Sequence, residues 1–98
     1  MPNWNKRIID LGSVKEKTKQ VFSFLYTGKV EIHSAVPGCT SCTKVHVNPT
    51  GIEVHYTPDP IPNHIVLLQG FQMSKKMVVV YFVDGTQDVL YFTAKIVK

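Results

Sequence analysis

The chain has 98 residues, of which 44% are hydrophobic and 18% are charged, and its formal net charge is +4. This length fits one domain that buries its own core, so we expect residues 1–98 to form a single unit. The composition excludes a disordered or fibrous chain, and the longest apolar run, residues 77–83, is too short to cross a bilayer. We therefore expect a globular protein with no membrane contact.

The positive charge comes almost entirely from lysines that are scattered along the chain, because Arg7 is the one arginine. Proteins that read nucleic acids usually concentrate arginine and interleave it with aromatic residues. The balance therefore indicates a mild attraction to acidic surfaces and no specific nucleic-acid partner. Residues 1–7 contain no apolar segment typical of a secretory signal, so we expect synthesis in the cytoplasm without export.

Short runs of alternating apolar and polar residues predict strands along most of the chain. In the strand expected at residues 18–26, for example, Phe22, Phe24 and Tyr26 share one face, which we expect to be buried. In chain order, strands are expected at residues 7–11, 18–26, 30–34, 45–47, 52–57, 64–68, 76–83 and 89–97.

The connections between these strands also have sequence signatures. The prolines of residues 58–62 cannot donate to a sheet, so this segment is expected either to cross a sheet edge or to bridge the two sheets. Residues 84–86 contain a glycine between two long strands, which is typical of the tip of a β-hairpin. Seven or eight short strands with regular turns predict an all-β fold, an immunoglobulin-like antiparallel β-sandwich.

Three short motifs then suggest a family. They are Asp10-Leu11-Gly12-Ser13-Val14, Phe22-Ser23-Phe24 before a Thr27-Gly28 turn, and Gly38-Cys39-Thr40. In this order they resemble a bacterial and phage family of unknown function related to the ASH (abnormal-spindle-type) immunoglobulin-like domains. Its members read as D-x-G-x-V, F-x-F-x-N-x-G and C-G-C-T.

The resemblance implies a role in holding protein surfaces together. Typical relatives are exported, whereas no export signal is seen here, and tailed bacteriophages use such domains on capsids, necks and tails. We therefore expect a structural component of a virion, a capsid decoration, neck or tail accessory protein, that binds other protein subunits or further copies of itself. The alternative is a small cytosolic protein-binding module, for which stabilisation by zinc through the loop of Cys39 and Cys42 is one option.

The zinc hypothesis rests on four side chains within a short segment. Cys39 and Cys42 have the C-x2-C spacing, and His33 and His46 lie on either side of them. Zinc favours four such ligands in a tetrahedron, and a closed set of four would be structural. The same cysteines fit two other states, a Cys39–Cys42 disulfide or buried free thiols. No other cofactor is expected.

We expect no enzyme activity. A cysteine paired with His33 or His46 would resemble a nucleophile and its base, but neither an orienting carboxylate nor a glycine-rich oxyanion loop accompanies them.

Two groups of residues are candidates for an interface. Lys15, Lys17 and Lys19 would line one side of an extended segment, either to dock on an acidic surface or to protect a sheet edge from unwanted pairing. Aromatic residues fall on both faces of the last hairpin, so one face is expected in the core and the other, with Tyr81 and Tyr91, against another subunit. Trp4 is expected either to anchor an interface or to pack on the core.

Overall fold

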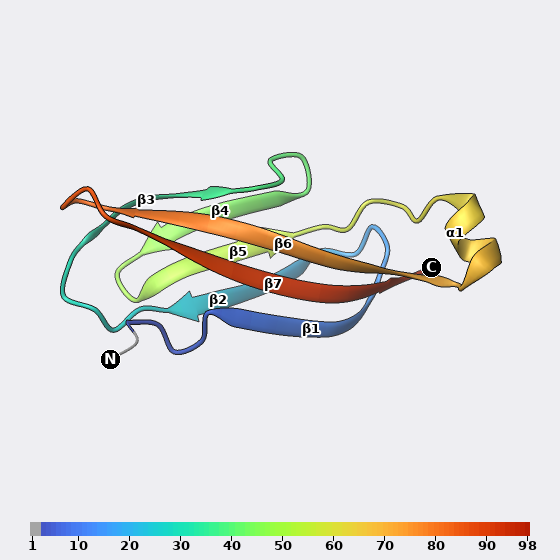
Figure 1. The fold of residues 1–98 in the computed structure, drawn as a ribbon, viewed down its shortest axis with the longest axis horizontal. Helices are drawn as coiled ribbons and strands as arrows, with labels where there is room; N and C mark the ends of the chain where they lie inside the picture. The colour runs from blue at the N-terminus through green and yellow to red at the C-terminus, as the bar shows by residue number, and fades with distance from the viewer. Residues whose placement is uncertain (1–2) are drawn as a thin grey trace.

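The computed structural model describes residues 3–98 as an elongated β-sandwich with one short helix at one end, 48 × 24 × 18 Å in extent (Figure 1). The elements are β1 (Ile8–Lys15), β2 (Gln20–Leu25), β3 (Ile32–Pro37), β4 (Thr43–Asn48), β5 (Gly51–Tyr56), α1 (Asn63–Leu68), β6 (Phe71–Phe82) and β7 (Gln87–Val97).

The strands form two sheets. Four of them lie in the order β1-β7-β6-β3 and three in the order β2-β5-β4. The pairing between β1 and β7 is parallel, and the other pairs are antiparallel. The predicted all-β sandwich of seven to eight strands is therefore confirmed with seven strands in the described part of the chain, and the parallel edge strand is the difference from an all-antiparallel arrangement.

Aromatic side chains join the two sheets. The ring of Phe92, on β7, packs edge-on against Phe22 of β2 and Tyr56 of β5, with 5.0 Å between ring centroids in each pair. Phe92 and Tyr56 are almost fully buried, at 1% and 2% exposed. Edge-to-face aromatic pairs bury large apolar areas in a defined geometry, so these contacts fix how the sheets face each other.

The first strand continues past residue 11, where it was predicted to end, and runs to Lys15. Gly12 has a φ of 71°, which side chains with a Cβ rarely adopt, and its N–H donates to the Asp10 carboxylate at 2.9 Å. The pairing with β7 shifts register between Asp10 and Ser13. Gly12 therefore forms a bulge, which lets β1 extend to Lys15.

A similar shift changes the inward face of β3. The sequence predicts Ile32 and Ser34 on one face, but the pairing with β6 is irregular between these residues. Ala35 instead pairs with the buried Val80, so the core receives Ile32 and Ala35.

The strand predicted at residues 64–68 is wrong, because these residues form α1. The carbonyl of Pro62 accepts hydrogen bonds from Ile65 N–H at 3.0 Å and Val66 N–H at 3.2 Å, which starts the helix. Gly70 ends it with a φ of 77°. An unbroken apolar run carries no period that separates a buried strand from a short helix, and that explains the error.

The proline-rich crossover is confirmed between β5 and α1, and the β1–β2 turn holds it in place. Lys17 N–H donates to the Pro58 carbonyl at 2.9 Å, and the Glu16 carboxylate accepts the Ile61 N–H at 2.6 Å.

The predicted terminal hairpin is confirmed as β6 and β7, although β6 begins earlier than expected, at Phe71. At its tip the Asp84 carboxylate accepts hydrogen bonds from the N–H and the hydroxyl of Thr86, at 3.0 and 2.6 Å. These bonds hold the pKa of Asp84 below its ordinary value.

We expect Phe92→Ala to lower the free energy of unfolding by about 3 to 5 kcal/mol, because it leaves a cavity between the sheets. Urea denaturation followed by circular dichroism measures the change. Met73→Ala, at a site that is 63% exposed, is the control and should leave stability nearly unchanged. Equal effects of the two substitutions would contradict the assignment of Phe92 to the core.

We expect Asp84→Ala to destabilise the hairpin at neutral pH but not in acid. A carboxyl whose pKa is lowered on folding stabilises the folded state above its unfolded pKa, and this contribution disappears as the pH falls through the folded value. The urea midpoints of the variant and the parent should therefore differ at about pH 7 and converge near about pH 2. A difference that persists in acid would contradict the stabilising role of the ionised Asp84 carboxylate. The control is Asp59→Ala, at an exposed loop position.

Candidate functional site

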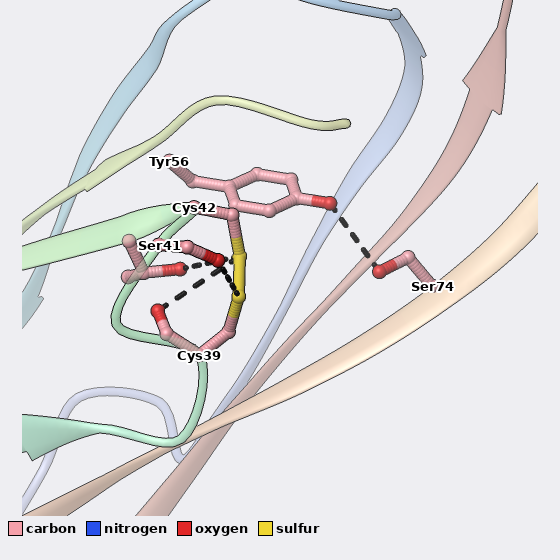
Figure 2. Close-up of a disulfide and its surroundings, with 6 residues drawn as sticks. Cys39, Ser41, Cys42, Tyr56 and Ser74 are labelled. Carbon is pink, nitrogen blue, oxygen red and sulfur yellow. Dashed lines mark hydrogen bonds between the residues drawn. A yellow bond between two sulfur atoms is a disulfide. The ribbon is translucent and has the colours of Figure 1, made fainter. Parts of the chain in front are cut away.

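The loop between β3 and β4 carries both cysteines, and they form a disulfide (Figure 2). Cys42 is buried, at 6% exposed, whereas Cys39 is partly exposed. Because β3 and β4 belong to different sheets, this loop crosses from one layer of the sandwich to the other. Of the three states that the sequence leaves open for these cysteines, the structure has the disulfide.

Hydroxyl groups surround the two sulfur atoms. The Ser41 Oγ lies 3.6 Å from Cys39 Sγ, and the Thr43 Oγ1 lies 3.4 Å from Cys42 Sγ. Disulfide sulfurs carry no hydrogen, so the hydroxyls are the donors in both pairs. Figure 2 shows the Tyr56 ring beside Cys42, with the Tyr56 hydroxyl 3.3 Å from Ser74 Oγ on the opposite sheet.

The four residues of the predicted zinc site do not form a tetrahedral ligand set in this structure. The two sulfurs are bonded to each other. His33 Nδ1 lies 3.2 Å from the Ser34 hydroxyl, and the His46 ring packs edge-on against His55 at 5.2 Å. Within residues 3–98, no group of three or more histidine, cysteine or acidic side chains is placed to hold a metal ion. The four side chains are therefore not gathered as a ligand set in this structure, and zinc binding by them stays a prediction.

A second candidate is the outer face of the four-stranded sheet. Paired residues of neighbouring strands lie side by side on one face, so apolar side chains from all four strands are adjacent there. We call this surface the apolar band; its residues are Ile8, Val36, Met77, Val79, Tyr81, Val89 and Tyr91.

The apolar band is accessible to solvent. Ile8 is 58% exposed, Val36 46%, Tyr81 40% and Met77 38%. A sheet face open to water usually carries mainly polar side chains, so an apolar face of this kind is typical of a contact surface.

Lysines lie beside the apolar band toward the α1 end of the sheet. The Lys75 ammonium lies 4.7 Å from the centre of the Tyr91 ring, and the Lys95 ammonium lies 4.4 Å from that of Phe71. These cation–π contacts hold positive charge over the rings. Asp10 and Lys75 both pair with Thr93, so the Asp10 carboxylate lies in the same cross-strand row as Lys75.

The structure confirms the prediction that the last hairpin has aromatic residues on both faces. Phe82 and Phe92 are buried, and Tyr81 and Tyr91 point outward. The contact of Tyr81 and Tyr91 with another subunit stays a prediction.

The sequence did not identify Ile8 and Val36 as part of the apolar band, because β1 and β3 pair with strands that are distant from them in the sequence. The sequence signal for this surface was the unbroken apolar run at residues 77–83.

Trp4 does not belong to an exposed interface. It is 2% exposed, its ring packs on Tyr26 at 4.8 Å, and its indole N–H donates to the Asp88 carboxylate at 2.9 Å. Arg7 lies 3.4 Å from the same carboxylate. The prediction of Trp4 as an interface anchor is therefore wrong, and its alternative, packing on the core, is confirmed.

The three lysines of the β1–β2 region are exposed but do not line one extended segment. Lys15 ends β1, Lys17 lies in the turn with a φ of 61°, and Lys19 precedes β2. The chain reverses direction between the two strands, so the alternate spacing of the three lysines does not place them on one side of a single strand. Since β1 and β2 are edge strands of different sheets, Lys15 and Lys19 lie where charge discourages edge-to-edge pairing.

An open hollow of about 490 Å³ lies beside Tyr26, with Lys29 and Glu31 at its rim. The Tyr26 hydroxyl donates to the Val30 carbonyl at 2.7 Å. Burial of the ring, and then the negative charge of Asp88, raise the pKa of Tyr26. The phenol therefore stays protonated and acts as a structural donor.

Comparison with models of known protein families and with curated proteins found no match. Within residues 3–98, no helix combines the length and hydrophobicity needed to span a membrane.

We expect reduction of the disulfide to lower the free energy of unfolding by about 2 kcal/mol, because it closes a loop of only four residues. Chemical denaturation with and without a phosphine reductant measures the difference, and the double variant Cys39→Ser, Cys42→Ser is the control for reductant effects. Complete unfolding upon reduction would contradict this expectation.

Proposed function

We propose that this chain is a non-enzymatic protein that binds other protein subunits, as a bacteriophage virion component such as a capsid decoration, neck or tail accessory protein. The observation that carries the proposal is the apolar band, which leaves side chains from four strands in contact with solvent. The phage setting follows from the family resemblance of the sequence motifs.

The composition of the apolar band supports binding to a protein. Tyrosine and methionine are enriched where proteins meet, because they bury a large area with few polar groups. Tyr81, Tyr91 and Met77 provide such side chains on adjoining strands of a sheet with a buried inner face. Association with a partner would remove this apolar area from water, which is the main favourable term in protein association.

The charges beside the apolar band favour an acidic partner. Lys75 and Lys95 stand over aromatic rings at one end of the sheet, and the chain as a whole is positive. A subunit surface with carboxylates next to an apolar patch would complement both features.

The shape of the surface supports a binding role over catalysis. Small-molecule sites are usually concave pockets with a few convergent polar groups. The apolar band is instead the outer face of a sheet, built from aliphatic and aromatic side chains of paired strands. A repeating lattice of subunits presents flat surfaces that such a face can cover.

The double substitution Ile8→Asp, Met77→Asp tests the proposal, because it places two carboxylates in the apolar band at exposed positions. We expect at least about a tenfold loss of association, since charges at the centre of a contact cost more than those at its rim. Phage particles assembled with the parent or the variant are purified on a density gradient, and the copies of the chain per particle are counted by quantitative mass spectrometry.

The matched control is Val21→Asp, which changes a 53% exposed valine on β2, in the other sheet, and should leave association unchanged. Circular dichroism is used to check that the parent, the double variant and the control are all folded. Absence of the parent chain from purified particles would overturn the virion assignment. Binding of the parent to one soluble partner through the same residues would support the cytosolic binding module in its place.

A further inference from the structure

The main chain around the disulfide is held by hydrogen bonds that do not depend on the sulfur atoms. Gly38 N–H donates to the Met77 carbonyl at 2.9 Å, which ties the start of the loop to β6. Thr43 N–H donates to the Cys39 carbonyl at 3.1 Å, and Thr57 N–H donates to the Cys42 carbonyl at 2.9 Å. Each end of the loop is therefore tied to its own sheet by bonds that do not involve the sulfurs, so we expect the sandwich to stay folded when the disulfide opens.

The disulfide also constrains the unfolded chain less than one that closes a long loop would. Cys39 and Cys42 are three positions apart, and the stabilisation by a disulfide falls as the loop that it closes becomes shorter. Disulfides that add little stability are the ones that thiols reduce and reform readily. Both features separate this pair from a structural crosslink.

The surroundings of the two sulfurs are unequal. Cys39 is partly exposed, whereas Cys42 is 6% exposed. The Thr43 hydroxyl points at Cys42 Sγ, and a hollow of about 430 Å³ beside Cys42 is also lined by Lys19 and Lys44. The Thr43 hydroxyl, 3.4 Å from Cys42 Sγ, is a donor that stabilises a thiolate there, so Cys42 is the leaving group, and its burial makes Cys39 the more accessible sulfur.

We infer that the Cys39–Cys42 pair is a thiol–disulfide exchange site, with Cys39 as the sulfur that thiols attack and Cys42 as the sulfur that leaves. An incoming thiolate bonds to Cys39 Sγ, the disulfide breaks, and Cys42 leaves with the electron pair and takes a proton from solvent. A second donor thiolate then attacks the donor sulfur of the mixed disulfide and releases Cys39 as a thiolate, which is protonated in turn. Two thiols are thereby oxidised to a disulfide while the protein gains two electrons and two protons.

The test uses the full chain equilibrated in buffers of reduced and oxidised glutathione, with acid quenching and mass spectrometry. We expect the disulfide to open at millimolar glutathione while circular dichroism stays unchanged. Rapid alkylation during the reaction should trap glutathione on Cys39, and Cys42→Ser should form its mixed disulfide at least about tenfold faster than Cys39→Ser.

Thr43→Val removes the hydroxyl beside Cys42 and keeps the shape of the side chain, so it should slow reduction several-fold. Ser41→Ala is the matched control, because its hydroxyl faces Cys39 and not the leaving sulfur. The inference is overturned if the disulfide resists glutathione until the chain unfolds, or if the mixed disulfide forms first on Cys42. These readouts need no virion partner, so they stand or fall independently of the adhesion proposal.

Discussion

The contact of Phe92 with Phe22 and Tyr56 is the interaction on which the rest of the structure depends. Phe92 lies on β7, which pairs with both β1 and β6, so its position fixes three of the four strands in that sheet. Side chains alternate along a strand, and an inward Phe92 therefore requires an outward Tyr91. A shift of β7 by one residue would bring Tyr91 inward and dismantle the core and the apolar band together.

The two candidate functional surfaces, the apolar band and the disulfide loop, lie at different places in the sandwich and depend on different interactions. The apolar band lies on the middle of a regular sheet, where cross-strand pairs place side chains in rows, so its character depends on strand register. The disulfide lies in the loop that crosses between the sheets, where the hydroxyl groups of two loop residues lie beside the sulfurs. Val36 is on the strand that leads into this loop, so the two surfaces are close in the chain but distinct in chemistry.

Local patterns were sufficient to predict the two-layer fold and the terminal hairpin, because strand alternation and the turn at residues 84–86 are encoded in adjacent residues. They were insufficient where the chain departs from a period of two, as at the bulge of Gly12 and in α1. The cysteine spacing is compatible with a thiol pair, a disulfide or a metal site, and only the spatial neighbours separate these states. The sequence also left two positions open for Trp4, and its burial depends on tertiary packing that the sequence pattern does not reveal.

The parallel pairing of β1 with β7 has a mechanical consequence. The first and last strands of the domain lie side by side and run in the same direction, so tension applied between the start of β1 and the end of β7 pulls along both strands in opposite senses. The ladder between them is then loaded in shear, and its hydrogen bonds must break together instead of one after another. Such a domain resists stretching along its long axis far better than a hairpin that is pulled open from one end.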